Sequence, residues 1–151
     1  MTNSELAQKL RDLRDFLIIA GYEESHATRY THLSRYIEKM PEDVETMRRE
    51  ARLKEIPGVG GLVATYVKEI LEDGVSSKQK DWEPFAPITV LELVRIPGLG
   101  AKTAKRLFHE FKIASAEDLR RALESGELEG KPGLGPKTLG SWRTELDGGA
   151  A

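Results

Sequence analysis

Three copies of a Pro-Gly-apolar-Gly turn are the residues of this 151-residue chain whose types and spacing best suit binding chemistry. They are PGVG from Pro57 (turn 1), PGLG from Pro97 (turn 2) and PGLG from Pro132 (turn 3). Proline stops a preceding helix and glycine permits a positive φ, so each copy predicts a tight turn between two helices, with positive φ at its glycines. The helix after each turn presents unpaired backbone N–H groups and the positive end of its dipole. Those groups can bind a phosphate without reading a base.

The turns recur about every 35 to 40 residues, which is the spacing of a duplicated helical unit. The apolar residue between the two glycines is Val59, Leu99 or Leu134, and we expect it to point back into the core. A small residue, Ala64 or Ala104, follows the second glycine by four positions in turns 1 and 2. It would let the paired helices approach closely, whereas turn 3 has a leucine at that place.

A single turn of this kind most often does no more than join two packed helices. Lys-Thr follows turns 2 and 3 after one residue, and this recurrence favours nucleic-acid binding for both. Turn 1 has Lys54 as its nearby basic residue, so its role stays open between packing and binding. The stretch GVGGLVAT does not indicate a P-loop, because no Gly-Lys-Ser/Thr follows it and no predicted strand precedes it.

Charge is unevenly distributed along a chain whose formal net charge is −2. Basic side chains gather around turn 2 at Lys102, Lys105, Arg106 and Lys112, with Glu110 among them. We therefore expect an anionic ligand to meet turn 2 first, and we exclude a protein that coats polyanions over its whole surface. The run RREARLK is interpreted as a solvated face and not as a binding patch.

The composition excludes several other kinds of chemistry. There is no cysteine, so disulfides and thiolate chemistry are ruled out. The three histidines, His26, His32 and His109, lack zinc-binding spacing and are expected at the surface. No apolar run approaches the ~20 residues of a membrane span, and the first residues lack the order of a signal peptide. These features predict a cytoplasmic, nucleoid-associated protein without a membrane partner.

The elements that must position the turns read as helices almost throughout, so the predicted fold class is all-α. We expect the first helix to be capped by Asn3 or Ser4 and to end at Gly21. Further helices are expected over residues 23–40, 41–56 (restarting at Pro41), 63–74, 88–96 and 115–126, the last capped by Ser115. The stretch ITVLELVRI also reads as a buried strand, but helix is preferred because no partner strand is visible.

The domain organisation follows from the least regular stretch, VSSKQKDWEPFAPI, which predicts a linker over residues 75–86. It would separate a first domain over residues 1–74, with turn 1, from a second over residues 87–147, with turns 2 and 3. A frayed tail is expected at residues 148–151. The expected architecture is therefore two lobes of tandem helix-hairpin-helix domains.

The chain from Asn3 to Leu146 resembles the N-terminal lyase domain and the adjoining fingers region of family X DNA polymerases, in the bacterial and archaeal branch with a third hairpin. The matching landmarks are NSELAQKLRDLRDFLIIAG, RYTHLSRYIEKMPEDVE, LKEIPGVGGLVATYVKEILEDG, LELVRIPGLGAKTAKRLFHEFKIASAEDLRRALESGELEG and KPGLGPKT. In that family the hairpins grip DNA strands beside a gap, each through backbone amides aided by a sodium or potassium ion on hairpin carbonyls. The resemblance implies DNA as the partner and no cofactor other than such an ion.

The resemblance also assigns roles to residues by position. The amide donors would be Gly58, Gly60, Leu62, Gly98, Gly100, Lys102, Thr103, Gly133, Gly135 and Lys137, and Lys105 belongs to the same DNA-binding surface. The ion would be held by the carbonyls of Lys54, Ile56 and Val59 in one hairpin and of Val94, Ile96 and Leu99 in the next. Tyr30 falls where the family has a tyrosine beside an abasic sugar, and His26 falls near its 5′-phosphate pocket.

Two departures from the family limit the expected activity. No Asp-x-Asp pair is present to hold magnesium ions, and the chain ends where the palm would begin, so we expect no polymerisation. Tyr66 stands at the place of the lyase lysine, and a phenol cannot form a Schiff base. Lys68 is about 200° further around the helix and should face away.

The sequence thus predicts a non-enzymatic protein that binds gapped, nicked or 5′-phosphorylated DNA in DNA repair, with a polymerase or ligase as its protein partner. One alternative is a 5′-deoxyribose-phosphate lyase that uses Lys68 as a substitute nucleophile. The other is a protein-interaction module, because helical domains with such hairpins also serve as docking platforms and the net charge is near zero. Salt-sensitive DNA binding would count against the second alternative.

Overall fold

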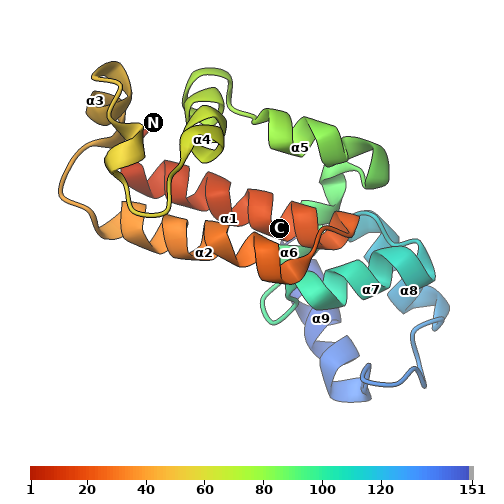
Figure 1. Ribbon diagram of the computed structural model, residues 1–151. Helices are drawn as coiled ribbons and strands as arrows, with labels where there is room; N and C mark the ends of the chain where they lie inside the picture. Colours follow the sequence, from red (N-terminus) through yellow and green to blue (C-terminus); the bar gives the residue numbers. More distant parts are fainter. Residues whose placement is uncertain (150–151) are drawn as a thin grey trace. The chain divides into compact units, whose positions relative to one another are not determined.

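The computed structural model describes residues 1–149, and every regular element among them is helical (Figure 1). The predicted all-α class is therefore confirmed. The chain divides into two compact units, one from Met1 to Phe85 (unit 1) and one that begins at Ala86 (unit 2). No helix of the described residues is both long and apolar enough to cross a membrane.

Unit 1 is built on two long helices that pack along each other, α1 (Asn3–Ala20) and α2 (Glu24–Lys39) (Figure 1). The shorter elements that follow are α3 (Val44–Arg49), the 3-10 turn η1 (Leu53–Glu55), α4 (Gly61–Asp73), α5 (Ser77–Trp82) and η2 (Glu83–Phe85). Their apolar faces meet in one core of Leu6, Leu10, Leu13, Leu17, Tyr30, Leu33, Ile37, Val44, Met47, Leu53, Ile56, Val59, Val63, Val67 and Ile70. Turn 1 contributes Ile56 and Val59 to this core, so its position is fixed by packing.

The start of α1 differs by one or two residues from the expected cap. Thr2 is the N-cap, and its side chain accepts a hydrogen bond from the Glu5 N–H at 3.0 Å. Asn3 instead spans to the start of α3: its amide donates to the Glu42 carbonyl at 2.8 Å and accepts from the Val44 N–H at 2.8 Å. An asparagine that satisfies two distant backbone groups is not free to cap its own helix.

The helix expected over residues 41–56 is interrupted. Asp43 caps α3 by accepting from the Thr46 N–H at 3.2 Å, so the helix begins after Pro41 rather than at it. It ends at Arg49, and Ala51 takes a left-handed backbone with φ of 56°. A left-handed residue cannot continue an α-helix, so the chain reverses there and re-forms as η1.

The segment expected to be a linker is mostly helical. Ser76 caps α5 by accepting from the Gln79 N–H at 3.2 Å. Trp82 packs against the unit 1 core, and its ring lies 5.2 Å from that of Tyr22. The boundary between the units therefore falls between Phe85 and Ala86, near the end of the expected linker, because an aromatic contact holds α5 onto unit 1.

Unit 2 contains the 3-10 turn η3 (Ile88–Val90) and helices α6 (Leu91–Val94), α7 (Ala101–Phe111), α8 (Ala116–Ser125) and α9 (Pro136–Gly149). The helical reading of ITVLELVRI and the Ser115 cap of α8 are confirmed. Helix α9 continues through Gly149, so the first two residues of the expected tail are helical, and Ala150 and Ala151 lie outside the described residues. The core of unit 2 includes Val90, Leu93, Ile96, Leu99, Ala104, Leu107, Ile113, Leu119, Leu123, Leu128, Leu134, Leu139, Trp142 and Leu146.

Candidate nucleic-acid interface

The three turns share one backbone hydrogen-bond pattern. An N–H at the end of the preceding segment bonds three residues back: Ile56 to Leu53 at 3.2 Å, Ile96 to Leu93 at 3.1 Å and Lys131 to Leu128 at 3.4 Å. The N–H between the glycines does the same: Val59 to Ile56, Leu99 to Ile96 and Leu134 to Lys131, all at 3.0 Å. The following helix opens on the second glycine: Ala64 to Gly60 and Ala104 to Gly100 at 2.9 Å, and Leu139 to Gly135 at 3.0 Å. Turn 3, which has a leucine in place of the small residue of turns 1 and 2, thus has the same hairpin backbone as the others.

The two glycines of each turn have different backbone roles. The first glycine has a positive φ of 86° in turn 1, 83° in turn 2 and 77° in turn 3. The second is extended, with φ of −90° at Gly60 and −91° at Gly100, and it is the N-cap of the next helix. Positive φ was expected at both glycines, and only the first requires it. The second turns from the loop into the helix, which an extended residue can do.

The apolar residue between the glycines is buried, as predicted. Val59 is 6% exposed, and Leu99 and Leu134 are each 3% exposed. Ala104 is fully buried, which allows α7 to pack closely against its neighbours. Packing of these side chains directs the glycines outward, and all six turn glycines are exposed.

The N-termini of α4 and α7 lack the usual side-chain cap. Gly60 and Gly100 are the N-cap residues, and they have no side chain to accept from the next amides. The N–H groups at the start of each helix, including those of Leu62, Lys102 and Thr103, therefore have no bond within their helix. Such amides, with the helix dipole behind them, attract an anion. Helix α9 begins with Pro136, which has no N–H, so Lys137 is the next donor there.

Positive charge beside turns 2 and 3 comes from exposed lysines, with Lys102 and Lys105 on α7 and Lys137 on α9. Arg106 behaves differently. Its Nε donates to Glu110 at 3.1 Å, and its Nη1 donates to the carbonyl of Pro132 in turn 3. The charge of Arg106, a member of the predicted basic cluster, is therefore already paired within the protein. Arg106 braces turn 3 against α7, a link between residues 26 apart that the sequence pattern did not reveal.

Turn 1 differs from the other two in its side chains. Leu62, 64% exposed, occupies the place that Lys102 and Lys137 hold after turns 2 and 3. The cation near turn 1 comes from the segment before the turn. The Lys54 Nζ lies 3.8 Å from where a Cβ of Gly61 would be. Lys54 and Lys68 line one surface depression together with Arg48. Tyr30, His26 and Tyr66 are not among its lining residues.

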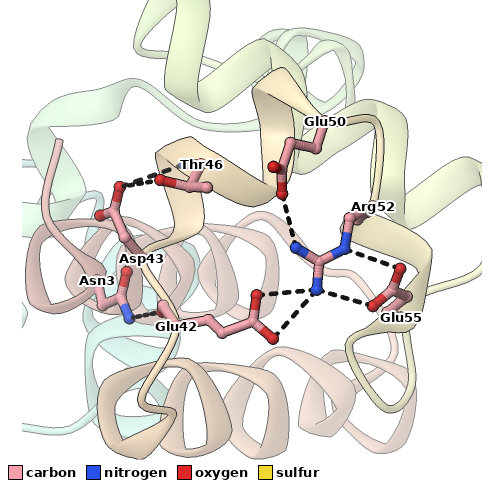
Figure 2. A network of polar contacts seen from close by, with 7 residues as sticks. All are labelled: Asn3, Glu42, Asp43, Thr46, Glu50, Arg52 and Glu55. Carbon is pink, nitrogen blue, oxygen red and sulfur yellow. Dashed lines mark hydrogen bonds and ion pairs between the residues drawn. The ribbon is translucent and has the colours of Figure 1, made fainter.

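The segment that leads into turn 1 is held by a cluster of charges around Arg52 (Figure 2). The guanidinium donates to Glu50 at 2.7 Å, to Glu42 at 2.9 Å and to Glu55 at 3.0 Å. The hydrogen bond from Arg52 holds the pKa of Glu55 below its usual value, and the three carboxylates raise the pKa of Arg52. The charged side chains of the run RREARLK are exposed or half-buried, whereas its Leu53 belongs to the core, and Arg52 is a structural centre that links the segments on both sides of α3.

The carbonyls expected to hold an ion include two that already accept turn hydrogen bonds. The carbonyl of Ile56 accepts from Val59, and that of Ile96 accepts from Leu99. A carbonyl oxygen has two lone pairs, so each can still contact a cation. Neutral oxygens suit sodium or potassium, which are hard cations. Within the described residues no group of three or more histidine and acidic side chains is arranged to bind a metal.

The residues expected at an abasic sugar do not lie together at the surface. Tyr30 is 1% exposed and belongs to the unit 1 core, which contradicts a role in contacting DNA. Burial, followed by the nearby Tyr22, raises its pKa to about 12. Tyr66 is 9% exposed. His26 is exposed, with its ring 6.2 Å from that of Tyr22, in agreement with the expected surface position.

Comparisons with known proteins agree with this geometry. One curated relative is the DNA polymerase/3′-5′ exonuclease PolX of Bacillus subtilis (strain 168), 26% identical over 99 residues. The alignment covers 66% of this chain and 17% of that protein, so the chain spans a small part of its relative. Residues 90–147 match the family model described as a SAM-like helix-hairpin-helix tandem. That range contains turns 2 and 3, and we conclude that residues 90–147 form a tandem helix-hairpin-helix domain.

Proposed function

We propose that this chain binds DNA without sequence specificity, through backbone amides of its hairpins that contact phosphates. The observation that carries the proposal is the repeated hairpin backbone, in which glycine-capped helices present amides without a side-chain cap. The helix-hairpin-helix match and the similarity to part of a polymerase support it.

In this mechanism the protein contacts the phosphates of DNA and makes no contact that depends on base sequence. A phosphate oxygen accepts from the amides at the start of α7, where an exposed glycine surface allows close approach, and Lys102 and Lys105 add Coulomb attraction. A protein with net charge −2 can hold DNA in this way because attraction is confined to the hairpins. Sodium or potassium on the carbonyls of turns 1 and 2 would neutralise a further part of the phosphate charge.

The preferred DNA is proposed to be a gapped, nicked or 5′-phosphorylated end, in repair together with a polymerase or ligase. Hairpins in two separate units can each hold one strand segment, which suits an interrupted duplex better than a continuous one. The resemblance of the sequence to family X polymerases supports this preference.

Fluorescence anisotropy with labelled duplexes tests the proposal. We expect the affinity to be highest for gapped duplex, lower for nicked duplex and lowest for intact duplex. Binding should be tighter with a 5′-phosphate than with a 5′-hydroxyl, and the affinity for two unrelated sequences should be equal. Equal affinity for gapped and intact duplex would contradict the proposed preference for interrupted DNA. A strong dependence of affinity on base sequence would contradict phosphate recognition.

A further inference from the structure

A surface depression at the end of α2 lies apart from the hairpin turns. It is lined by Arg35, Tyr36, Lys39, Met40 and Pro41, and its volume is about 420 Å³. This volume falls within the ~300–1,000 Å³ range of small-ligand sites. None of the roles proposed above for the hairpins uses these residues.

Tyr36 is a large aromatic side chain left open to solvent, with 45% of its surface exposed. On an adjacent face of α2, Leu33 and Ile37 are buried in the unit 1 core and hold the helix in place. Helix α2 ends at Lys39, three residues after the tyrosine, because Met40 is extended and Pro41 follows it. A fixed helix end therefore presents the ring beside two further apolar side chains.

The charges around this ring are positive. Arg35 and Lys39 are both exposed, and the described residues include no ion pair to either. No carboxylate of the described residues lines the depression. The acidic neighbour in the sequence, Glu38, is bonded to Arg11 at 3.3 Å. The site thus combines an open aromatic face with two cations whose charge is not cancelled by a paired acid.

We propose that this depression binds an unpaired nucleotide of single-stranded DNA, with its base stacked on Tyr36. Arg35 and Lys39 contact the flanking phosphates, and Met40 and Pro41 form the apolar edge of the site. Aromatic faces flanked by basic side chains are how proteins hold single strands without reading their sequence. The charge favours a polyanion over an apolar peptide as the occupant. This site goes beyond the proposed hairpin function, because it uses the base and does not need the hairpin amides.

The test compares two oligonucleotides of the same length, an oligothymidylate and its abasic analogue, which has the same phosphates and no bases. Wild-type protein should bind the oligothymidylate more tightly. Tyr36→Ala should weaken that binding by roughly 5- to 150-fold and remove the difference between the two oligonucleotides. Tyr36→Phe should retain both the affinity for the oligothymidylate and the difference between the two oligonucleotides, because stacking uses only the face of the ring. Arg35→Gln and Lys39→Gln should each lower the salt slope by about 0.7.

Two controls separate this site from the hairpins and from folding. Phe85→Ala removes another aromatic side chain of unit 1, which is 58% exposed. This change should alter neither the affinity for the oligothymidylate nor the affinity for its abasic analogue. Gly100→Val, which blocks a hairpin, should leave the base-dependent difference intact even if binding to gapped duplex is lost. Amide chemical shifts of the wild-type protein on addition of oligothymidylate should move at residues 35–41. The proposal is overturned by equal binding of the two oligonucleotides to the wild type, by unchanged binding in Tyr36→Ala, or by shifts that avoid this segment.

Discussion

Replacing Arg106 by methionine should show that this residue positions turn 3 and does not itself bind DNA. The guanidinium donates to the Pro132 carbonyl and to Glu110, and its side chain is 29% exposed. It also passes close to turn 3, with Nη1 3.5 Å from where a Cβ of Gly133 would be. Methionine keeps an aliphatic stem of similar length but removes both bonds, so the change isolates the polar contacts.

The magnitude follows from these two contacts. A hydrogen bond from a charged donor contributes about 1.5–3 kcal/mol when well shielded, and the partial exposure of Arg106 places its bond near the lower end. The ion pair with Glu110, whose side chain is 57% exposed, adds about 0–1 kcal/mol. We expect the free energy of unfolding to fall by about 1.5–2.5 kcal/mol. Affinity for gapped DNA should fall because turn 3 is no longer held in place.

A double-mutant cycle measured by anisotropy distinguishes positioning from direct contact. Gly135→Val disables turn 3, and in that background Arg106→Met should have no further effect on affinity. Lys105→Met is the matched control on the same helix: it should lower the salt slope by about 0.9 in both backgrounds, as expected for a phosphate contact. An Arg106→Met effect of equal size in both backgrounds, with a lowered salt slope, would refute the positioning role.

Three further predictions concern the turns and the lost chemistry. Gly98→Ala should lower the free energy of unfolding by about 1–2 kcal/mol because φ is 83°, whereas Gly100→Ala should cost less than 1 kcal/mol because φ is −91°; equal losses in denaturant unfolding would contradict the assigned backbone. Binding to gapped DNA at constant ionic strength should be tighter in potassium than in tetramethylammonium, and equal binding in the two salts would contradict the proposed ion at the hairpin carbonyls. Borohydride trapping with 5′-incised abasic DNA should give only background for the wild type and a small gain for Tyr66→Lys, since burial lowers a lysine pKa; wild-type trapping that disappears in Lys68→Ala would instead show a lyase.

The hairpins could be predicted from the sequence because their determinants are local. Proline and glycine restrict the backbone directly, and the buried positions of Val59, Leu99 and Leu134 follow from the turn itself. The burial of Tyr30 was also within reach, because Ala27, Tyr30 and Ile37 lie on one helical stripe. The resemblance to a family with a tyrosine at that place favoured a surface role, and the periodicity was the better indication.

The remaining features depend on contacts between distant residues. The bond from Arg106 to Pro132 and the gathering of Glu42, Glu50 and Glu55 around Arg52 have no periodic signature. The left-handed Ala51 breaks a pattern that reads as helical, and a non-glycine residue gives no warning of such a break. These links between elements, more than the elements themselves, were beyond the reach of pattern and propensity.

The central claim, that backbone amides of the hairpins bind DNA phosphates, is tested most directly by the affinity of Gly100→Val for gapped duplex. Valine fits the backbone at Gly100, where ψ is 177°, and its Cβ would meet no atom of the protein within 4 Å. Gly140→Val is the matched control, because that glycine has equally open space and lies within α9, away from the turns. The account predicts a folded Gly100→Val protein that binds more weakly than either Lys105→Met or Gly140→Val. A folded Gly100→Val protein that binds like the wild type would contradict it.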